Sequence, residues 1–347
     1  MNKEKYTPLE IGILLFFLLN SFTSSILIKS FKNTSSVNII LSILISTVIG
    51  FIILKILFKL WNDDFLNNIS NTKILSIIFK IIFIISAIAI GVYSIFNISI
   101  IIKETILPNM SQKTIELTFL ILATILAIKG MKSISIATSL MFLVYLLVII
   151  IDYAFNLFNV DPINLLPITL NINKINFYQT LILTIGPIFM LLIIPKKEII
   201  NFRKCKKDMN IFYLIFYVYL TIKILFIISI LGEKYFAIVS HPEIEILKMI
   251  NIFNFFERLE ELLIISMFIE NLVTTSFAIY YLYTTINSIY DLKKKTYILI
   301  NIIIFLILIK IDILPNSYLI TILTIFIITN IFTYKKNIKN NNGIVPK

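Results

Sequence analysis

The chain has very little of the chemistry on which soluble enzymes rely. It contains one cysteine, Cys205, and one histidine, His241, among 347 residues. A single cysteine excludes an internal disulfide and any metal site built from several cysteines. Carboxylates do not cluster inside the apolar stretches, so hydrolysis and metal chemistry have no evident set of residues. We therefore expect no catalytic residues, no bound metal and no cofactor.

Charged residues are also scarce, at 14% of the chain, whereas hydrophobic residues make up 59%. The mean hydropathy of +0.96 is far above that of soluble domains, in which about half of the residues are apolar. Stretches of roughly twenty apolar residues recur along the whole length, and each is long enough to cross a bilayer. The sequence predicts an all-α integral membrane protein surrounded by the lipid bilayer.

We predict about ten transmembrane helices within a single polytopic membrane domain that covers residues 1–347. The ranges are 8–28, 37–60, 74–102, 112–130, 134–156, 178–195, 211–231, 256–287, 295–312 and 316–334. The first range carries no small-residue cleavage site, so we expect it to remain as a membrane helix.

The net charge of +12 would suggest a nucleic-acid partner if the protein were soluble. In this chain the basic residues gather in alternate loops, as they do between Lys196 and Lys207. Such alternation fixes membrane topology and favours contact with anionic lipid headgroups. The pattern predicts cytoplasmic N- and C-termini and no binding of nucleic acid.

Two of the predicted spans contain interruptions at related places. The first span carries the polar cluster from Asn20 to Ser25, whose hydroxyls can satisfy backbone groups freed by a break in the helix. The sixth span carries Gly186-Pro187, where proline removes a backbone donor and clashes with the preceding turn. Breaks five spans apart indicate an inverted-repeat transporter fold with a ligand site at the bilayer midplane. Each break taken alone also fits ordinary helix packing.

Charged residues are concentrated at the beginning of the predicted eighth span, and one more lies near its middle. The segment 257–261 places its glutamates on one helical face, and Arg258 can pair with one of them. This cluster fits an interfacial group of ion pairs as well as a coupling role. Glu270 lies near the middle of the span, so we expect it to be protonated, paired or facing a cavity. Lys223 in the seventh span is the candidate partner, and a structural bridge and a proton or ligand role both stay open.

Several short motifs resemble those of the spore germination permeases, which are the B subunits of germinant receptors in endospore-forming bacteria and belong to the amino acid–polyamine–organocation superfamily. The family's "(F/Y)P…NFxER" segment resembles the residues His241-Pro242 and Asn254-Phe255-Phe256-Glu257-Arg258-Leu259. Further matches are Lys129-Gly130 and Asn164-Leu165-Leu166-Pro167. The chain departs from the family where His241 replaces an aromatic residue and where serine replaces the glycine of the first break.

The resemblance implies a LeuT-like 5+5 inverted repeat with interrupted helices 1 and 6. It also implies a small-molecule germinant, with an amino acid favoured, and no catalysis. The partners implied are a membrane-embedded A subunit and a lipoprotein C subunit, and the location implied is the spore inner membrane. The B subunit would sense the germinant and signal to these partners.

The resemblance further implies a pocket among spans one, three, six and eight. Carried over to this chain, it predicts hydroxyl contacts on span one, a tyrosine–asparagine pair on span three, the break on span six and a polar group on span eight. The predicted ligand contacts are Ser21, Ser24, Ser25, Tyr93, Asn97, Gly186, Pro187, Thr275, Ser276 and Tyr280. The predicted coupling or structural charges are Lys223, Glu257, Arg258 and Glu270. Glu270 lies about 120° around the helix from Ser276, so we expect it on a different wall.

Two other interpretations of the function stay open. A proton- or sodium-coupled amino acid permease would have the same fold and the same pocket. A scaffold that keeps the fold without binding a ligand would also fit the small number of polar side chains. The genes that flank this one would distinguish a receptor subunit from a transporter.

Overall fold

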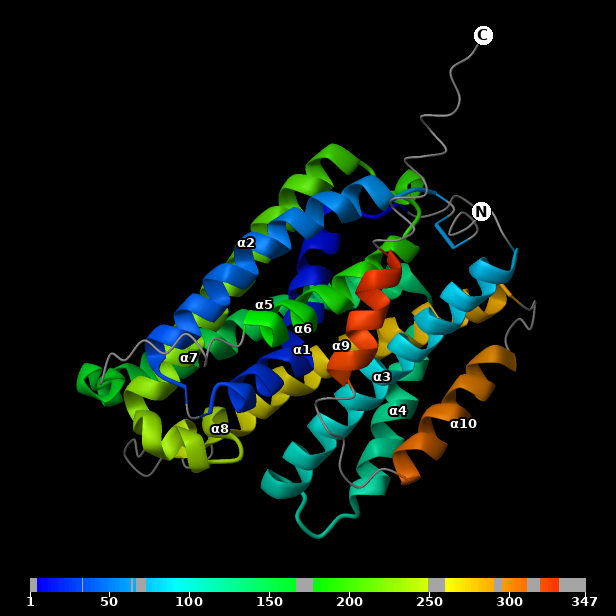
Figure 1. The fold of residues 1–347 in the computed structure, drawn as a ribbon. Coiled ribbons are helices and arrows are strands. Elements are labelled where there is room, and N and C mark those ends of the chain that lie inside the picture. The colour runs from blue at the N-terminus through cyan, green and yellow to red at the C-terminus, as the bar shows by residue number, and fades with distance from the viewer. Residues whose placement is uncertain are drawn as a thin grey trace.

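A computed structural model describes residues 5–32, 34–63, 65–66, 73–166, 177–248, 260–289, 295–310 and 319–330. The regular elements in these ranges are helices, and one isolated backbone bridge joins Tyr6 to Ile199. Figure 1 shows them as a bundle of tilted helices.

The α-helices are α1 (Pro8–Ser30), α2 (Ser36–Leu60), α3 (Lys73–Thr105), α4 (Gln112–Ile128), α5 (Met131–Asn156), α6 (Phe177–Phe189), α7 (Phe202–Ile238), α8 (Pro242–Lys248), α9 (Glu260–Asn287) and α10 (Lys295–Lys310). The short 3₁₀ helices are η1 (Leu157–Asn159), η2 (Pro162–Leu165), η4 (Met190–Ile193) and η5 (Lys196–Glu198). A last helix covers Leu319–Asn330.

Within the described residues, six helices are long and apolar enough to cross a membrane. They are Pro8–Ser30, Ser36–Leu60, Ile74–Thr105, Met131–Asn159, Phe202–Ile238 and Glu260–Asn287. Shorter apolar helices at Phe177–Ile193, Leu299–Leu308 and Leu319–Asn330 lie where the sequence predicts the sixth, ninth and tenth spans. The prediction of an all-helical, multi-pass membrane protein is therefore confirmed.

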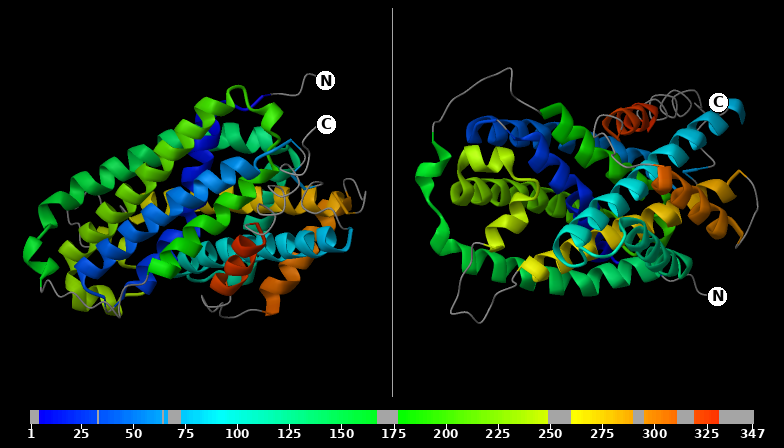
Figure 2. Two further views of the ribbon diagram at one scale, coloured as in Figure 1. Left: turned by 45° about the horizontal axis from the view of Figure 1, so that its top comes forward. Right: turned by 90° about the horizontal axis from the view of Figure 1, so that it is seen from below.

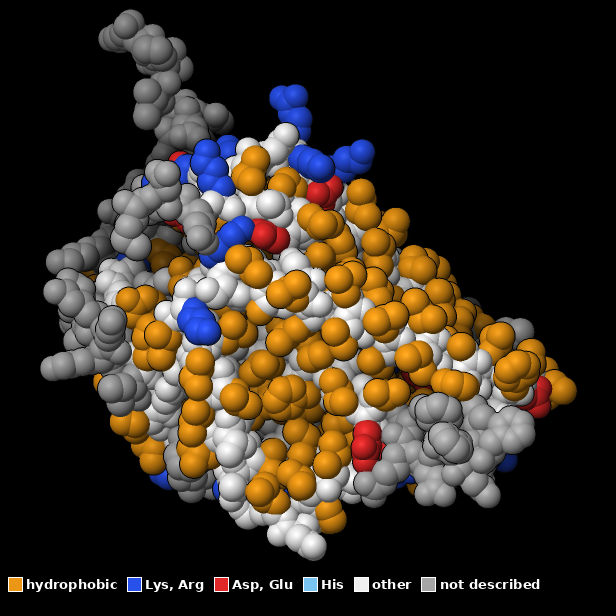
Figure 3. All heavy atoms as spheres, turned by 180° about the vertical axis from the view of Figure 1, so that it is seen from behind, with side chains coloured by type: hydrophobic (Ala, Val, Ile, Leu, Met, Phe, Trp, Pro, Cys, Tyr) orange, Lys and Arg blue, Asp and Glu red, His pale blue; other side chains and the backbone are white. Residues whose placement is uncertain are grey.

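The outer surface matches this assignment. Figure 3 shows hydrophobic side chains over the broad flank of the molecule, with Lys and Arg gathered towards one end. On α5, for example, Leu140, Leu143, Leu147 and Ile150 each expose more than half of their surface. An apolar flank of this extent is stable against lipid tails and would be unfavourable in water.

Helix α1 is the centre of the bundle. The most apolar window of this helix is 100% buried inside the protein, and the helix contacts α5, α6, α7 and α9. Helix α3 packs along α9, and α2 lies against α6 and α7 (Figure 2). The central residues of α1 are therefore surrounded by protein, so partners for their polar groups can come only from within the bundle.

Helix α7 is longer than the predicted span of 211–231. It begins at Phe202, where the side chain of Asn201 accepts a hydrogen bond from the backbone of Lys204 at 3.0 Å. Four of the basic residues that we expected in a loop, from Arg203 to Lys207, lie in its first turns, because Lys and Arg are good helix formers. Lys196 and Lys197 lie in η5. The helix is interrupted at Gly232, whose φ of 74° lies in the left-handed region that favours glycine.

The start of α1 is joined by backbone hydrogen bonds to the segment between α6 and α7. The amide of Tyr6 donates to the carbonyl of Glu198 at 2.7 Å, and the amide of Ile200 donates to the carbonyl of Tyr6 at 3.0 Å. Thr7 caps α1 through a reciprocal pair of hydrogen bonds with Glu10. These contacts fix the beginning of α1 relative to the segment that follows α6.

Candidate functional site

Helix α1 is broken at Ser21, inside the polar cluster that the sequence predicts as an interruption. Ser21 has φ −48° and ψ −113°, which is not a helical conformation, and the helix resumes after it. A break of this kind frees backbone groups from their normal partners in the helix. The predicted interruption of the first span is present.

Asn20, directly before the break, links three helices. Its Nδ2 donates to Oε1 of Glu270 on α9 at 2.6 Å and to the hydroxyl oxygen of Tyr145 on α5 at 2.6 Å. All three side chains are buried. Two buried oxygens beside the break, Oδ1 of Asn20 and Oγ of Ser21, have no hydrogen-bond partner among the described residues. The break in α1 therefore combines a buried carboxylate with unsatisfied polar groups.

A second polar group lies on the side of α8. Nζ of Lys223 on α7 is 2.5 Å from Oε2 of Glu243 on α8, and both side chains are buried. The ammonium also lies 5.7 Å from the ring centroid of Tyr219, a favourable cation–π geometry. The partner of Lys223 is thus Glu243. Glu270, the partner considered from the sequence, instead accepts from Asn20.

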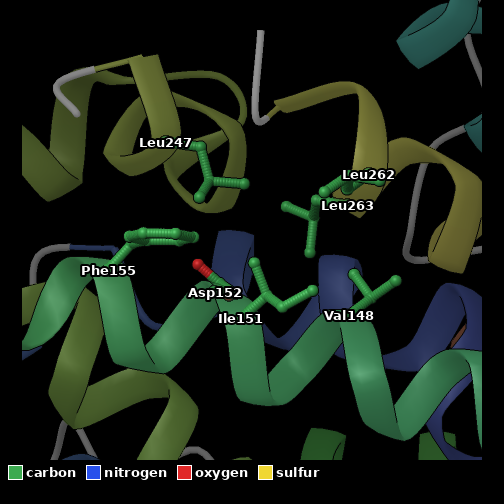
Figure 4. A pocket seen from close by; sticks show the side chains of 7 residues that line it. All are labelled: Val148, Ile151, Asp152, Phe155, Leu247, Leu262 and Leu263. Atoms are coloured by element: carbon green, nitrogen blue, oxygen red, sulfur yellow. The ribbon is translucent and has the colours of Figure 1, made fainter. Parts of the chain in front are cut away.

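Asp152, near the end of α5, extends this polar group towards a small cavity. Its Oδ1 accepts from Nδ2 of Asn156 at 2.9 Å. Figure 4 shows Asp152 beside Phe155 and Leu247 in a cavity closed by apolar side chains from α5, α8 and α9. The cavity has a volume of about 10 Å³, which is about the space of one water molecule.

Together these residues place three acidic side chains, Asp152, Glu243 and Glu270, around one buried lysine. Glu270 and Asp152 both lie within electrostatic range of Lys223. Burying charge at this depth is costly unless it is paired, hydrated or neutralised by a proton. An acidic excess beside a broken helix can bind a cation, exchange a proton or hold two conformations of the bundle in balance.

The predicted ligand contacts lie on helices that meet around α1. Helix α1 contacts α3, α6 and α9, and α3 packs against α9. Ser21 and Ser24 are buried, and Oγ of Ser24 donates to the Ser21 carbonyl at 3.3 Å. The side chain of Ser25 lies outside the described residues.

On α3 and α9 the predicted contacts are mostly enclosed. Tyr93 and Asn97 are each 8% exposed. Oγ of Ser276 donates to the Leu272 carbonyl at 2.7 Å, so its proton is used within its own helix. Thr275 is buried, and its hydroxyl has no hydrogen-bond partner in the described part of the chain, whereas Tyr280 is only partly buried. The roles of these residues in ligand binding stay predictions.

The second predicted break, Gly186-Pro187, lies within α6. Pro187 is inside the helix, which continues to Phe189 and then becomes the 3₁₀ helix η4. Gly186 packs so closely against Leu323 that a Cβ atom would lie 2.8 Å from it. The change of helix type thus follows the proline, as its missing donor requires.

The charged segment is described only in part. Glu257, Arg258 and the rest of Asn254–Leu259 lie outside the described residues. Two other motifs do have a structural explanation. Gly130 has φ 92° at the turn between α4 and α5, and Nδ2 of Asn164 donates to the Ser229 carbonyl at 2.9 Å, next to the interruption in α7.

The helices with their apolar flank and buried polar network define a multi-pass membrane protein. A family model described as "spore germination protein" matches residues 13–318. The chain belongs to this family, which is of permease type, and the resemblance seen in its motifs is confirmed. No curated protein matches the chain.

Proposed function

We propose that this protein is the membrane B subunit of a spore germinant receptor. It would lie in the spore inner membrane with both termini in the cytoplasm, and it would act with an A subunit and a lipoprotein C subunit. Its ten spans would form a LeuT-like 5+5 inverted repeat within one membrane domain. The family assignment supports this class of function, and the broken α1 supports a ligand site within the bundle.

The observation that carries the proposal is the bond from Asn20 to Glu270 at the break in α1. A helix interrupted at mid-length, with unsatisfied oxygens and a buried carboxylate, is unfavourable unless it serves a site. A small germinant, with an amino acid favoured, would bind near this break through freed backbone groups and few side chains. The surrounding contacts would come from Tyr93 and Asn97 on α3 and from Thr275, Ser276 and Tyr280 on α9.

Binding would act by shifting the balance between two conformations of the bundle. A ligand can shift such a balance only by binding one conformation more tightly than the other. Closure of α1 and α6 against α3 and α9 would provide this difference. The same closure would move the surfaces that contact the partner subunits.

The second candidate is a proton- or sodium-coupled amino acid permease. The observation that favours it is the excess of buried carboxylates around Lys223, because such groups mark ion and proton pathways in membrane proteins. This function would use the same break and the same helices.

One experiment separates the two functions. Spores that lack the gene are tested for germination with a panel of amino acids, sugars, nucleosides and salts, and uptake of the same labelled solutes is measured in vegetative cells. A selective loss of response to one germinant with normal uptake supports the receptor. Normal germination with lost uptake makes the protein a transporter.

A site variant then tests the pocket. Tyr280→Ala should raise the germinant concentration that is needed for a half-maximal response. An unchanged dose–response curve at normal protein level would remove Tyr280 from the site.

A further inference from the structure

A polar cavity lies at the end of the bundle that carries α8, away from the break in α1. It has a volume of about 280 Å³, close to the lower end of the range of about 300–1,000 Å³ for small-molecule pockets. Its walls come from the end of α3, the α7–α8 connection and α8. The lining residues are Glu104, Thr105, Val239, Ser240, His241, Ile244, Glu245 and Lys248.

Both signs of charge face this cavity. Glu104 on α3 forms one wall, and Glu245 and Lys248, 3.4 Å apart, form the α8 wall. Lys32 lies close by, since its Nζ donates to the Val239 carbonyl at 2.6 Å. The lining itself carries two carboxylates and one ammonium group, so a simple anion would meet Glu104 and Glu245 and a simple cation would meet Lys248. A molecule with both an ammonium and a carboxylate group fits this lining better than either.

His241 adds a neutral polar group between the two walls. Burial, followed by the positive charges of Lys29, Lys32 and Lys248, lowers the pKa of His241 to about 4. Its Nε2 lies 3.3 Å from Oε2 of Glu104. The contact with Glu104 is therefore made by a neutral imidazole at physiological pH.

One residue of the cavity lining, Ile244, is adjacent along α8 to the buried ion pair of Glu243 and Lys223. Ile244 lines the cavity and is buried, while its neighbour Glu243 points the other way and pairs with Lys223. Helix α8 has only seven residues, so a molecule bound against Glu245 and Lys248 would press on the same short element that holds Lys223.

We propose that this cavity is a binding site for a small zwitterion such as a free amino acid, separate from the site at the break in α1. Glu104 would take the ammonium group and Lys248 the carboxylate. Occupation would be sensed by α8 and passed to Lys223 through Glu243. The site does not depend on the proposed pocket near Tyr280.

The test uses a thiol placed at the cavity. The native cysteine, Cys205, is buried, whereas Ser240 is exposed, so Ser240→Cys supplies an accessible thiol. The full-length protein in detergent is labelled with a maleimide, and the rate is measured with each of the standard amino acids except cysteine, whose own thiol would consume the maleimide. Alanine amide and propionate serve as probes that lack one of the two charges.

At least one amino acid should slow labelling of Ser240→Cys, and the two single-charge probes should not. A matched control, Leu107→Cys, lies beyond α3 and outside the cavity lining, and its labelling should stay unchanged. Adding Glu104→Gln or Lys248→Gln should raise the protecting concentration about tenfold or more, as expected for a lost charge-assisted bond.

Two results would overturn the proposal. The first is that no amino acid protects the thiol. The second is that protection disappears when Tyr280→Ala is added and survives Glu104→Gln, because the thiol would then report the site at the break in α1. Protection that survives Tyr280→Ala supports the cavity even if the receptor role of the α1 break fails.

Discussion

The ammonium of Lys223 and the carboxylate of Glu243 lie 2.5 Å apart, with side-chain exposures of 10% and 6%. This ion pair joins the middle of a long helix, α7, to a short helix outside it, α8. It thereby connects the end of the bundle with the charges near its centre.

Removing one partner of this pair should strongly destabilise the protein. Glu243→Gln leaves the buried Lys223 without its counter-charge, and such a loss typically costs about 3–5 kcal/mol. Thermal unfolding in detergent measures the effect. Glu245→Gln on the same helix is the control, because its pair with Lys248 is more exposed and contributes about 1 kcal/mol or less. Equal melting of the two variants would show that the Lys223–Glu243 pair is not structural.

Two glycines offer a matched pair of alanine substitutions. A Cβ atom at Gly50 would collide with the hydroxyl of Tyr213, so Gly50→Ala should cost about 1–3 kcal/mol through overpacking. A Cβ atom at Gly91 would lie 3.6 Å from that of Ala278, an ordinary contact. Gly91→Ala should be neutral or stabilising by about 1 kcal/mol, because alanine favours helix over glycine. Melting temperatures in the opposite order would show that α2 and α7 do not pack as described.

The stability of the protein should fall in acid through His241. The folded imidazole has a pKa of about 4, whereas an exposed imidazole has a pKa of about 6.5. Between these two values the unfolded chain binds a proton that the folded chain does not, so stability is lost as the pH falls through this window. His241→Gln should remove this part of the loss. Melting curves of both proteins across the window test it, and parallel curves would exclude the effect.

Asn20 should be needed for the response to germinant. Asn20→Leu removes the donor to Glu270 and Tyr145, so the carboxylate loses its hydrogen bond from Asn20. We expect the germinant concentration for half-maximal response to rise about tenfold or more. Ser86→Ala is the control, because the Ser86 hydroxyl donates to the Phe83 carbonyl of its own helix at 2.8 Å. A wild-type response at normal protein level would exclude Asn20 from the site.

Glu270→Gln separates the charge of this residue from its shape. The amide keeps an oxygen that can accept from Asn20, so folding should be retained while the exchangeable proton is lost. If Glu270 is linked to protons, the pH dependence of the germination response should change in this variant. Dose–response curves that match the wild type at each pH would show that the residue is only structural.

The long helices could be predicted from the sequence because apolar length alone determines them. The predicted range 8–28 corresponds to the observed helix Pro8–Ser30, and the predicted range 37–60 corresponds to Ser36–Leu60. The break in α1 was also predictable, because the polar cluster Asn20–Ser25 in the first span was matched by Gly186-Pro187 five spans later, although either feature alone also fits ordinary packing. The length of α7 could not be predicted. The sequence analysis limited the span to 211–231 because it assigned the basic residues before it to a loop, whereas Lys and Arg also form helices readily.

The site was harder to predict. Glu270 stood out as a carboxylate inside an apolar span, but its bond to Asn20 depends on how α1 lies against α9. Pairing of Lys223 with Glu243 depends on a turn of the chain through Gly232 and His241, which folds α8 back onto α7. Asp152 could have been noticed as an acidic residue near the end of the fifth span. Contacts of this kind follow from tertiary packing, which spacing along one chain does not determine.

The backbone bonds of Tyr6 to Glu198 and Ile200 have a mechanical consequence. They join the residue just before α1 to the connection that follows α6. A rearrangement of α1 that keeps these bonds would bend at Ser21, with the half beyond Ser21 moving. That half leads to Lys32, whose Nζ donates to the carbonyl of Val239 in the connection to α8. A pivot at Ser21 would therefore turn a small change at the centre of the bundle into a larger displacement at the end where α8 lies.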